Sequence, residues 1–376
     1  MRFVFLPSLS LLVMYVALCT AAEEPAPVSY ICLEAETGMV LTESNADLQR
    51  PPASMLKMMQ LLLVEEGIRI GKWRYDTEIA ISKHAQSMGG TQAYLKEGES
   101  WPLETLLKAI SVISANDASV AIAEGLWGSV ENCLLAMNNR AADLGMTNTH
   151  FYSVNGLPPD DGKTFDLTTA RDMATLGRAL LEYPNILKFT STKEFALRPE
   201  NTPKANTNKL LVTLPGCDGL KTGYIRAAGF CLTATAVQND IRLLAVVMGS
   251  DKRGRFTHTQ SLLEQGFQMV QRVEPVQART PIGKAIPVNK SMDEAVRLLA
   301  RDSITTIVRT DQLRNLTLEI TAPTALTAPV QGEMVHGQVR LMLGNQELGR
   351  SPLIADRSVE KARLTDYSVG CMGRKE

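Results

Sequence analysis

A serine and a lysine three residues apart begin a strongly apolar segment. On a helix, positions i and i+3 share a face, so the Lys57 amine can reach the Ser54 hydroxyl. A neutral amine at that place accepts the serine proton and makes the oxygen nucleophilic. The spacing by itself is weak evidence, because Ser358 and Lys361 repeat it in a polar stretch near the C-terminus. The alternative interpretation is a serine at a helix entry followed by a solvated lysine.

The surroundings of Lys57 favour the chemical interpretation. The segment from Met55 to Leu63 is apolar except for Lys57 and Gln60. A lysine among such neighbours lies either on an exposed stripe or out of water, and loss of hydration lowers the pKa of an amine. A helix that begins at Ser54 would also present free backbone N–H groups to a developing oxyanion.

A hydroxyl and a carboxamide, on Ser114 and Asn116, stand at a polar break between two apolar helical stretches. These groups could hydrogen-bond the serine–lysine pair and a substrate amide. The same Ser-x-Asn pattern occurs at Ser153 and Asn155, so it is unspecific. A plain break between helices is the alternative.

Lys221, Thr222 and Gly223 lie on an expected strand. A cation, a hydroxyl and a glycine that permits close backbone approach suit an anionic group beside the edge of a strand. Considered alone, the motif is no more than a strand end that runs into a turn.

The periodicity of apolar residues predicts the elements that would position these motifs. A β-hairpin is expected over 28–42, and helical spacing recurs in later segments. The helical segments are 54–67, 103–113, 118–126, 134–144 and 167–181. β-rich runs follow at 219–224, 230–237 and 241–248. This order predicts an α+β domain in which helices pack against one antiparallel sheet.

Proline-punctuated sequence around 275–287 separates this domain from a region of short β-prone pieces. Residues 25–272 are therefore predicted to form the first domain. Residues 276–356 are predicted to form a small all-β domain that carries no chemical motif. The segment 357–376 is polar and is expected to be a loose tail.

The N-terminus has the pattern of a secretory signal peptide over 1–22. A basic residue precedes the apolar run 3–18, and small residues come before the first acidic ones, with cleavage expected near Ala21 or Ala22. The alternatives are an uncleaved anchor, for which the run is shorter than the ~20 residues required, and a lipoprotein acylated at Cys19. We expect export to the periplasm or to the outer face of the cytoplasmic membrane.

The composition argues against several classes of function. The net charge is -1 without long runs of one sign, so no nucleic-acid partner is expected. The six cysteines and four histidines are widely spaced, and no glycine-rich phosphate loop occurs, so neither a metal nor a cofactor is expected. Cys217 and Cys231 flank an expected turn and could form a disulfide, although free thiols are the default interpretation.

Together and in this order, the three motifs are the signature of the penicillin-recognising serine acyltransferases. Over 28–267 the sequence resembles the low-molecular-mass D-alanyl-D-alanine carboxypeptidases of the peptidase S11 type. Further stretches that carry the likeness are 52–54, 144–151, 169–173 and 218–224. The second domain resembles the C-terminal β domain of that family at 328–330 and 349–353. The resemblance implies a β-lactamase/transpeptidase-like fold followed by a small all-β domain.

The resemblance also implies a reaction. The enzyme would remove the terminal D-alanine from peptidoglycan stem peptides that end in D-Ala-D-Ala. Ser54 would attack the carbonyl between the two D-alanines, and water would hydrolyse the acyl-enzyme. Lys57 would be the general base, and Ser114 would relay protons. The backbone N–H groups of Ser54 and Tyr224 would form the oxyanion hole.

A second set of residues is implied to bind the substrate. The set is Asn116, Lys221, Thr222, Gly223, Tyr224 and Arg255. Asn116 would hold the substrate amide, while Lys221 and Thr222 would hold the terminal carboxylate. Arg255 resembles the carboxylate-binding arginine of the family, and Arg253 is a close competitor. β-Lactam antibiotics present a carboxylate and a strained amide to the same groups, so inhibition is expected.

Two departures from the family pattern affect these expectations. Ile225 and Arg226 replace a polar pair found in many relatives, which could alter substrate preference. Membrane-bound relatives usually end in a long amphipathic helix, whereas 362–376 is short and has little apolar periodicity. Membrane association therefore stays open.

Other functions are compatible with the same motifs. Class A β-lactamases use a glutamate for deacylation, whereas 155–169 contains only the acidic residues Asp160, Asp161 and Asp166. A D,D-endopeptidase, which cuts cross-links, is a second alternative. A catalytically idle peptidoglycan-binding protein is a third.

Overall fold

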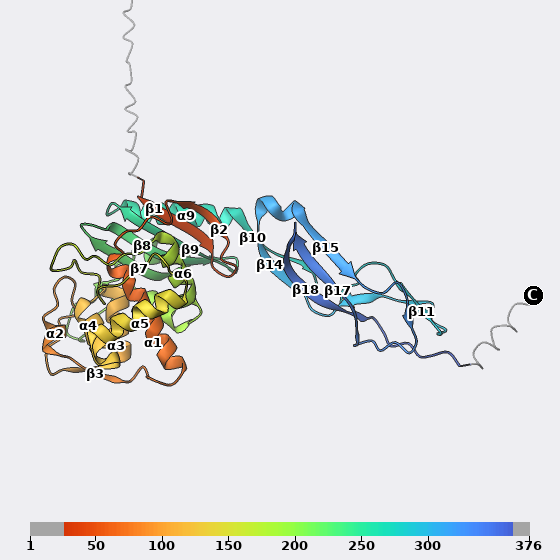
Figure 1. Cartoon of the computed structure of the whole chain (residues 1–376), viewed down its shortest axis with the longest axis horizontal. Helices are drawn as coiled ribbons and strands as arrows, with labels where there is room; N and C mark the ends of the chain where they lie inside the picture. Colours follow the sequence, from red (N-terminus) through yellow and green to blue (C-terminus); the bar gives the residue numbers. More distant parts are fainter. Residues whose placement is uncertain (1–25, 364–376) are drawn as a thin grey trace, which may run out of the picture.

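A computed structural model describes residues 26–363 as two domains arranged end to end (Figure 1). The expected signal peptide at 1–22, including Cys19, lies outside the described residues, as does the end of the polar tail. Within the described range, no helix is long and apolar enough to cross a bilayer.

Five antiparallel strands form the main sheet of the first domain, in the order β2-β1-β9-β8-β7. They are β1 Ser29–Glu34, β2 Val40–Ser44, β7 Cys217–Ile225, β8 Gly229–Gln238 and β9 Ile241–Ser250. The expected hairpin and the expected meander join in one sheet, because β1 pairs with β9 and Ile31 lies opposite Val246. β7, which carries the Lys-Thr-Gly motif, is the last strand of the sheet.

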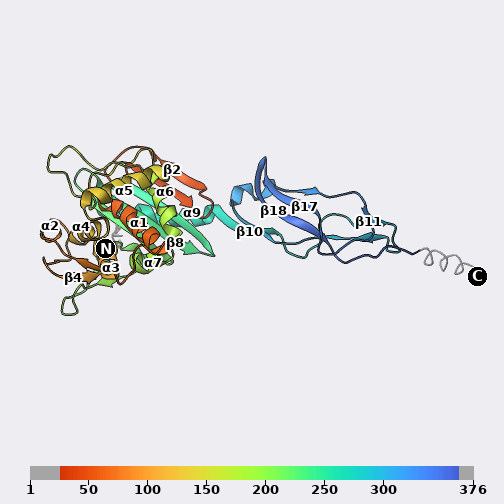
Figure 2. The ribbon, with the colours of Figure 1, turned by 60° about the horizontal axis from the view of Figure 1, so that its bottom comes forward.

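Alternation along β9 divides the core of the domain between the two faces of the sheet. Leu244 and Val246 belong to the larger apolar cluster, which includes α1 and α6. Leu243 and Ala245 belong to a second cluster, which includes Leu263 of α9. Successive side chains of a strand point to opposite faces, so helices cover both sides of the sheet (Figure 2).

The helices of this domain follow the expected segments, with additions. They are α1 Lys57–Arg69, α2 Lys83–Gln86, α3 Leu103–Lys108, α4 Asn116–Trp127, α5 Val130–Asp143, α6 Ala170–Leu181, α7 Asn185–Thr190, α8 Leu210–Thr213 and α9 Gly254–Met269. A 3-10 turn Ala53–Leu56 precedes α1, and a π-helical turn Ala109–Ile113 follows α3. The minor strands are β3 Glu78–Ala80, β4 Ser100–Pro102, β5 Glu194–Phe195 and β6 Lys204–Ala205.

The second domain consists of short strands around two small apolar clusters. Its strands are β10 Val270–Val276, β11 Ile286–Asn289, β12 Ala295–Val296, β13 Leu298–Ala300, β14 Ile304–Arg309, β15 Leu316–Thr321, β16 Leu326–Thr327, β17 Val335–Leu343 and β18 Gln346–Ala355. A 3-10 turn Thr310–Asn315 links β14 to β15. The largest of its sheets has the order β13-β18-β17-β15.

The domain limits differ in detail from those expected. The limit placed at 272 falls inside β10, which pairs with β14 of the second domain. Part of the segment expected to be a loose tail is hydrogen-bonded to this domain, because Val359 bridges to Val330 and the Ala362 amide donates to the Lys290 carbonyl. Backbone pairing of this kind is not visible in side-chain composition.

Candidate active site

Ser54 and Lys57 meet where the 3-10 turn continues into α1. Lys57 Nζ lies 3.0 Å from Ser54 Oγ. Ala53, directly before the serine, has a left-handed backbone with φ of 50°. Non-glycine residues adopt that conformation at a cost, so the surrounding contacts must hold Ala53 in it. The helix therefore places the two side chains one turn apart, as their spacing predicted.

The Lys57 amine is completely buried and makes no hydrogen bond to a charged group in the described residues. It donates to Asn116 Oδ1 at 2.9 Å and to the Asn155 carbonyl as well as to Ser54. Burial and the positive charge of Lys221 bring its pKa well below the usual value of a lysine, against opposing effects of two carboxylates. This environment favours the neutral amine, which is the form that can accept a proton.

Ser114 and Asn116 occupy the break between the π-helical turn and α4. Ser114 is buried and has a left-handed backbone, with φ of 62°. Asn116 begins α4, and its Nδ2 donates to the Gly89 carbonyl at 2.9 Å. The carboxamide thus lies against Lys57, whereas Ser114 is not among the hydrogen-bond partners of Lys57.

β7 places a second buried lysine beside the first. Lys221 Nζ donates to the Thr222 carbonyl at 3.1 Å. Burial, assisted by the charge of Arg255, lowers the pKa of Lys221 to about 7. Gly223 is required by packing, because a Cβ atom there would lie 2.6 Å from the Pro52 carbonyl oxygen. The strand and the serine turn therefore approach each other through backbone atoms.

Arg255, from the first turn of α9, reaches β7. Its Nη1 donates to the Gly223 carbonyl at 3.3 Å, and its guanidinium carbon lies 5.1 Å from the centre of the Phe230 ring. Burial lowers the pKa of Arg255 to about 10. Tyr224 is 53% exposed and stacks on Phe230 with ring centres 4.0 Å apart. The structure thus brings Arg255 to the strand, and Arg253 is an exposed residue directly before α9.

The family of the chain follows from comparison with known proteins. Residues 18–252 match the family described as D-alanyl-D-alanine carboxypeptidase. The chain belongs to this family. Residues 271–361 match the penicillin-binding protein 5 C-terminal domain. The expected two-part organisation of the family, with its mixed helical and antiparallel first domain and a sheet-rich second one, is confirmed.

Several curated relatives of this carboxypeptidase family cover nearly the whole chain. D-alanyl-D-alanine carboxypeptidase DacF of Bacillus subtilis (strain 168) is 34% identical over 92% of this chain and 89% of its own length. DacC of Escherichia coli (strain K12) is 33% identical over 89% of this chain and 84% of its own length. Penicillin-binding protein 5 of Haemophilus influenzae superposes with a TM-score of 0.68 at 26% identity, covering 89% of this chain and 98% of that one.

One relative, which matches a smaller part of this chain, was solved with a bound ligand. Penicillin-binding protein D2 of Listeria monocytogenes, solved in the ampicillin-bound form, is 30% identical with a TM-score of 0.58. The match covers 64% of this chain and 97% of that one.

Three residues at the candidate site were given no role in it by the sequence analysis. The Asn155 carbonyl oxygen accepts a hydrogen bond from Lys57 Nζ and another from Ser54 Oγ, at 3.3 Å. Thr207 Oγ1 lies 2.7 Å from Thr222 Oγ1. Asp166 accepts the Tyr152 and Ser153 amides and so fixes the loop that carries Asn155. The second Ser-x-Asn pattern was a signal for Asn155, but a backbone carbonyl has no residue-type signature.

Cys217 and Cys231 are free thiols, so the disulfide considered from their spacing is absent.

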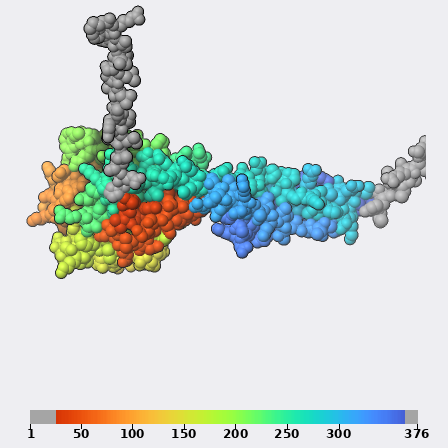
Figure 3. Space-filling model, turned by 90° about the horizontal axis from the view of Figure 1, so that it is seen from above, coloured from red at the N-terminus to blue at the C-terminus, as the bar shows by residue number. Residues whose placement is uncertain are grey.

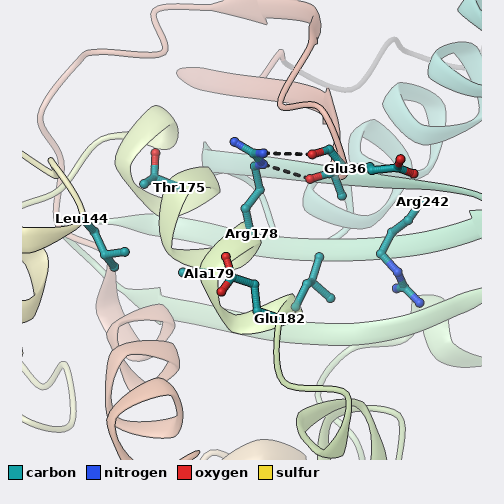
Figure 4. A pocket seen from close by; sticks show the side chains of 9 residues that line it. Glu36, Leu144, Thr175, Arg178, Ala179, Glu182 and Arg242 are labelled. Carbon is teal, nitrogen blue, oxygen red and sulfur yellow. Dashed lines mark hydrogen bonds between the residues drawn. The ribbon is translucent and has the colours of Figure 1, made fainter. Parts of the chain in front are cut away.

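A hollow of about 460 Å³ lies beside α6 (Figure 4). Its Arg178 already donates to the Ala35 and Glu36 carbonyls, and its Arg242 is paired with Asp218. Both arginines therefore already have hydrogen-bonding or ion-pair partners within the protein.

Proposed function

We propose that the chain is an exported serine-type D-Ala-D-Ala carboxypeptidase that removes the terminal D-alanine from peptidoglycan stem pentapeptides. The observation that carries this proposal is the buried Lys57 amine, 3.0 Å from Ser54 Oγ and hydrogen-bonded only to neutral oxygens. A buried lysine with these partners is suited to act as a base, because burial disfavours its charged form. The membership of the family supplies the substrate class.

The proposed reaction proceeds in two steps. Ser54 Oγ attacks the carbonyl carbon of the penultimate D-alanine while Lys57 takes the hydroxyl proton. The C–N bond breaks, and the leaving D-alanine receives a proton at its amine. Water then attacks the Ser54 ester, and the stem tetrapeptide leaves as a carboxylate while the serine hydroxyl is restored. Ser114, which precedes Asn116 at the break before α4, would relay protons to the leaving amine.

The remaining polar groups would bind the substrate and its transition state. Backbone N–H groups of Ser54 and Tyr224 would stabilise the oxyanion. Asn116 Nδ2 and the edge of β7 would hold the peptide backbone. Lys221 and Thr222, with Arg255 beside the strand, would bind the terminal carboxylate that distinguishes a chain end from an internal bond. Penicillins carry an equivalent carboxylate and a strained amide, so they would acylate the same serine.

Labelling with a fluorescent penicillin tests this proposal. We expect a covalent adduct with the wild-type protein and none with Ser54→Ala, resolved by denaturing gel and intact mass. We also expect release of D-alanine from a stem pentapeptide by the wild type alone. Rapid turnover of a chromogenic cephalosporin would instead indicate a β-lactamase. A chain that forms no adduct and releases no D-alanine would be a peptidoglycan-binding protein.

A further inference from the structure

β7 is the last strand of its sheet, and no described strand pairs with its outer edge. On the inner edge it pairs with β8, where Ile225 lies opposite Gly229. The Ile225 carbonyl accepts the Ala228 amide, so the backbone groups of Ile225 point toward the β8 side. Backbone groups of successive residues in a strand point to opposite edges. The N–H and C=O groups of Tyr224 therefore face the open edge.

The groups proposed to bind the substrate set the direction of a stem peptide along this edge. Lys221 and Thr222 would bind the terminal carboxylate, and the Tyr224 N–H would bind the oxyanion of the scissile carbonyl. The peptide therefore runs antiparallel to β7, and its upstream residues pass Tyr224 toward the turn between β7 and β8. Antiparallel strands pair residue by residue, at ~3.4 Å per step. With the penultimate D-alanine opposite Tyr224, stem position 3 lies opposite Ile225 and position 2 lies opposite Arg226.

The turn at which the stem peptide would arrive is positively charged. Arg226 is exposed in its first position, and its guanidinium has no hydrogen bond or ion pair to any described residue. The turn residues 226–228 include no acidic side chain. A second arginine contacts the same turn, because Arg50 Nη2 donates to the Ala228 carbonyl at 3.2 Å. Arg50 Nε is buried without a hydrogen-bond partner in the described part of the chain, so this guanidinium is not neutralised by a carboxylate there either.

We propose that Arg226 binds a carboxylate of the stem peptide upstream of the penultimate D-alanine. This inference rests on the proposed function. Two stem residues supply such a group. D-Glutamate at position 2 is linked through its side-chain carboxyl, so its α-carboxylate is free, and diaminopimelate at position 3 carries a carboxylate at the end of its side chain. The strand register favours position 2, which lies opposite Arg226.

The surroundings of Arg226 suit both parts of a γ-linked glutamate. Tyr224 is 53% exposed and stacks on Phe230, so its ring offers an apolar surface two residues before Arg226. The methylene groups of the glutamate pack on this ring, while the carboxylate meets the guanidinium, whose paired N–H groups match the two oxygens. Many members of the family have a polar pair in place of Ile225 and Arg226. The preference for a charged stem is therefore a property of this chain.

Four stem pentapeptides test the carboxylate site. They combine γ-linked D-glutamate or its α-amide, D-isoglutamine, at position 2 with diaminopimelate or lysine at position 3, and release of D-alanine gives kcat/KM for each. We expect the wild type to prefer glutamate over isoglutamine. In Arg226→Gln this ratio should fall about threefold or more, as for the loss of one exposed ion pair. Arg226→Lys should keep most of the preference, Arg226→Asp should reverse it, and high salt should weaken it in the wild type.

Arg314→Gln is the matched charge control. Arg314 is exposed in the 3-10 turn Thr310–Asn315 of the second domain, so its loss removes the same charge far along the chain from β7. This variant should leave every ratio unchanged. If Arg314→Gln lowers the glutamate preference as much as Arg226→Gln does, the net charge of the protein governs the preference and the carboxylate site is overturned.

The outcomes separate this inference from the proposed function. Fluorescent penicillin is used with every variant to verify that the serine site is intact. If penicillin labels Ser54 and D-alanine is released, but Arg226→Gln keeps all the wild-type ratios, the carboxylate site is overturned and the carboxypeptidase stands. If Arg226→Gln changes only the ratio of diaminopimelate to lysine, Arg226 binds the carboxylate of position 3. If penicillin labels neither the wild type nor the variants and no peptide is cleaved, both the site and the proposed function fail.

Discussion

The two buried lysines of the site influence each other through their charges. Lys57 and Lys221 are both out of water, and each buried ammonium loses hydration. The charge of Lys221 lowers the pKa of Lys57, whereas Asp166 and Asp117 raise it. Since the neutral amine is the proposed base, each neighbour should shift the pH at which acylation begins. The direction of each shift follows from the sign of its charge.

Replacing the second lysine should move the acid limb of acylation to higher pH. In Lys221→Met the repelling charge is lost, so the pKa of Lys57 rises and a higher pH is needed to deprotonate it. The measurement is the second-order rate of penicillin acylation against pH. Lys221 would also contact the ligand carboxylate, so the rate itself should fall, and the position of the limb is the informative quantity. If the acid limb of the pH profile stayed in place or moved to lower pH, the charge of Lys221 would not be what lowers the pKa of Lys57.

Replacing the buried carboxylate should have the opposite effect. In Asp166→Asn the attractive charge is lost, so the pKa of Lys57 falls and the acid limb moves to lower pH. The carboxamide oxygen can still accept the Tyr152 and Ser153 amides that Asp166 Oδ1 accepts, so the loop should keep its place. The second-order rate of penicillin acylation, followed against pH, measures this shift. A shift in the same direction as for Lys221→Met would show that loop displacement, and not charge, governs the limb.

At the scale of elements, the periodicity of apolar residues predicted those helices and strands that bury one face or are buried on all sides. α9 was missed, because only Gly254, Thr259, Leu263 and Gly266 of its residues are buried and two of these are glycines. Its apolar stripe is therefore weak, although it carries Arg255 and covers one face of the sheet. The motif residues were predictable by type and spacing, whereas the carbonyl of Asn155 acts through backbone geometry that residue types do not encode.

The contact between β7 and the serine turn should tolerate no side chain at its glycine. In Gly223→Ala the new Cβ would lie 2.6 Å from the Pro52 carbonyl oxygen, so the strand and the turn must separate. We expect penicillin acylation to fall by about 100-fold or more, as for a small misplacement of reacting groups. Gly71→Ala is the control, since its backbone φ of +75° is strained by alanine but no atom lies within 4 Å of the added Cβ. That variant should lose about 1 kcal/mol of stability and acylate normally.

At the scale of the whole molecule, the second domain contributes to an apolar cluster of the first domain. Ile307 of β14 lies in the apolar cluster beneath α9, together with Leu41 and Leu263 of the first domain. Arg309 of the same strand donates to the Leu41 carbonyl at 3.4 Å. Figure 3 shows the first hairpin, in red, meeting the blue surface of the second domain. The second domain therefore contributes packing to the face of the sheet opposite the serine.

Two isoleucines of β14 should separate the stabilities of the two domains. Ile304 is buried in the core of the second domain, whereas Ile307 is buried in the cluster shared with α9. Truncation of either to alanine should cost about 2–4 kcal/mol, because each leaves a cavity in a packed core. Ile307→Ala should lower the temperature at which penicillin labelling is lost, and Ile304→Ala should lower only the calorimetric transition of the second domain. Equal loss of labelling in both variants would mean that the domains unfold as one cooperative unit, and the shared cluster would then have no local role.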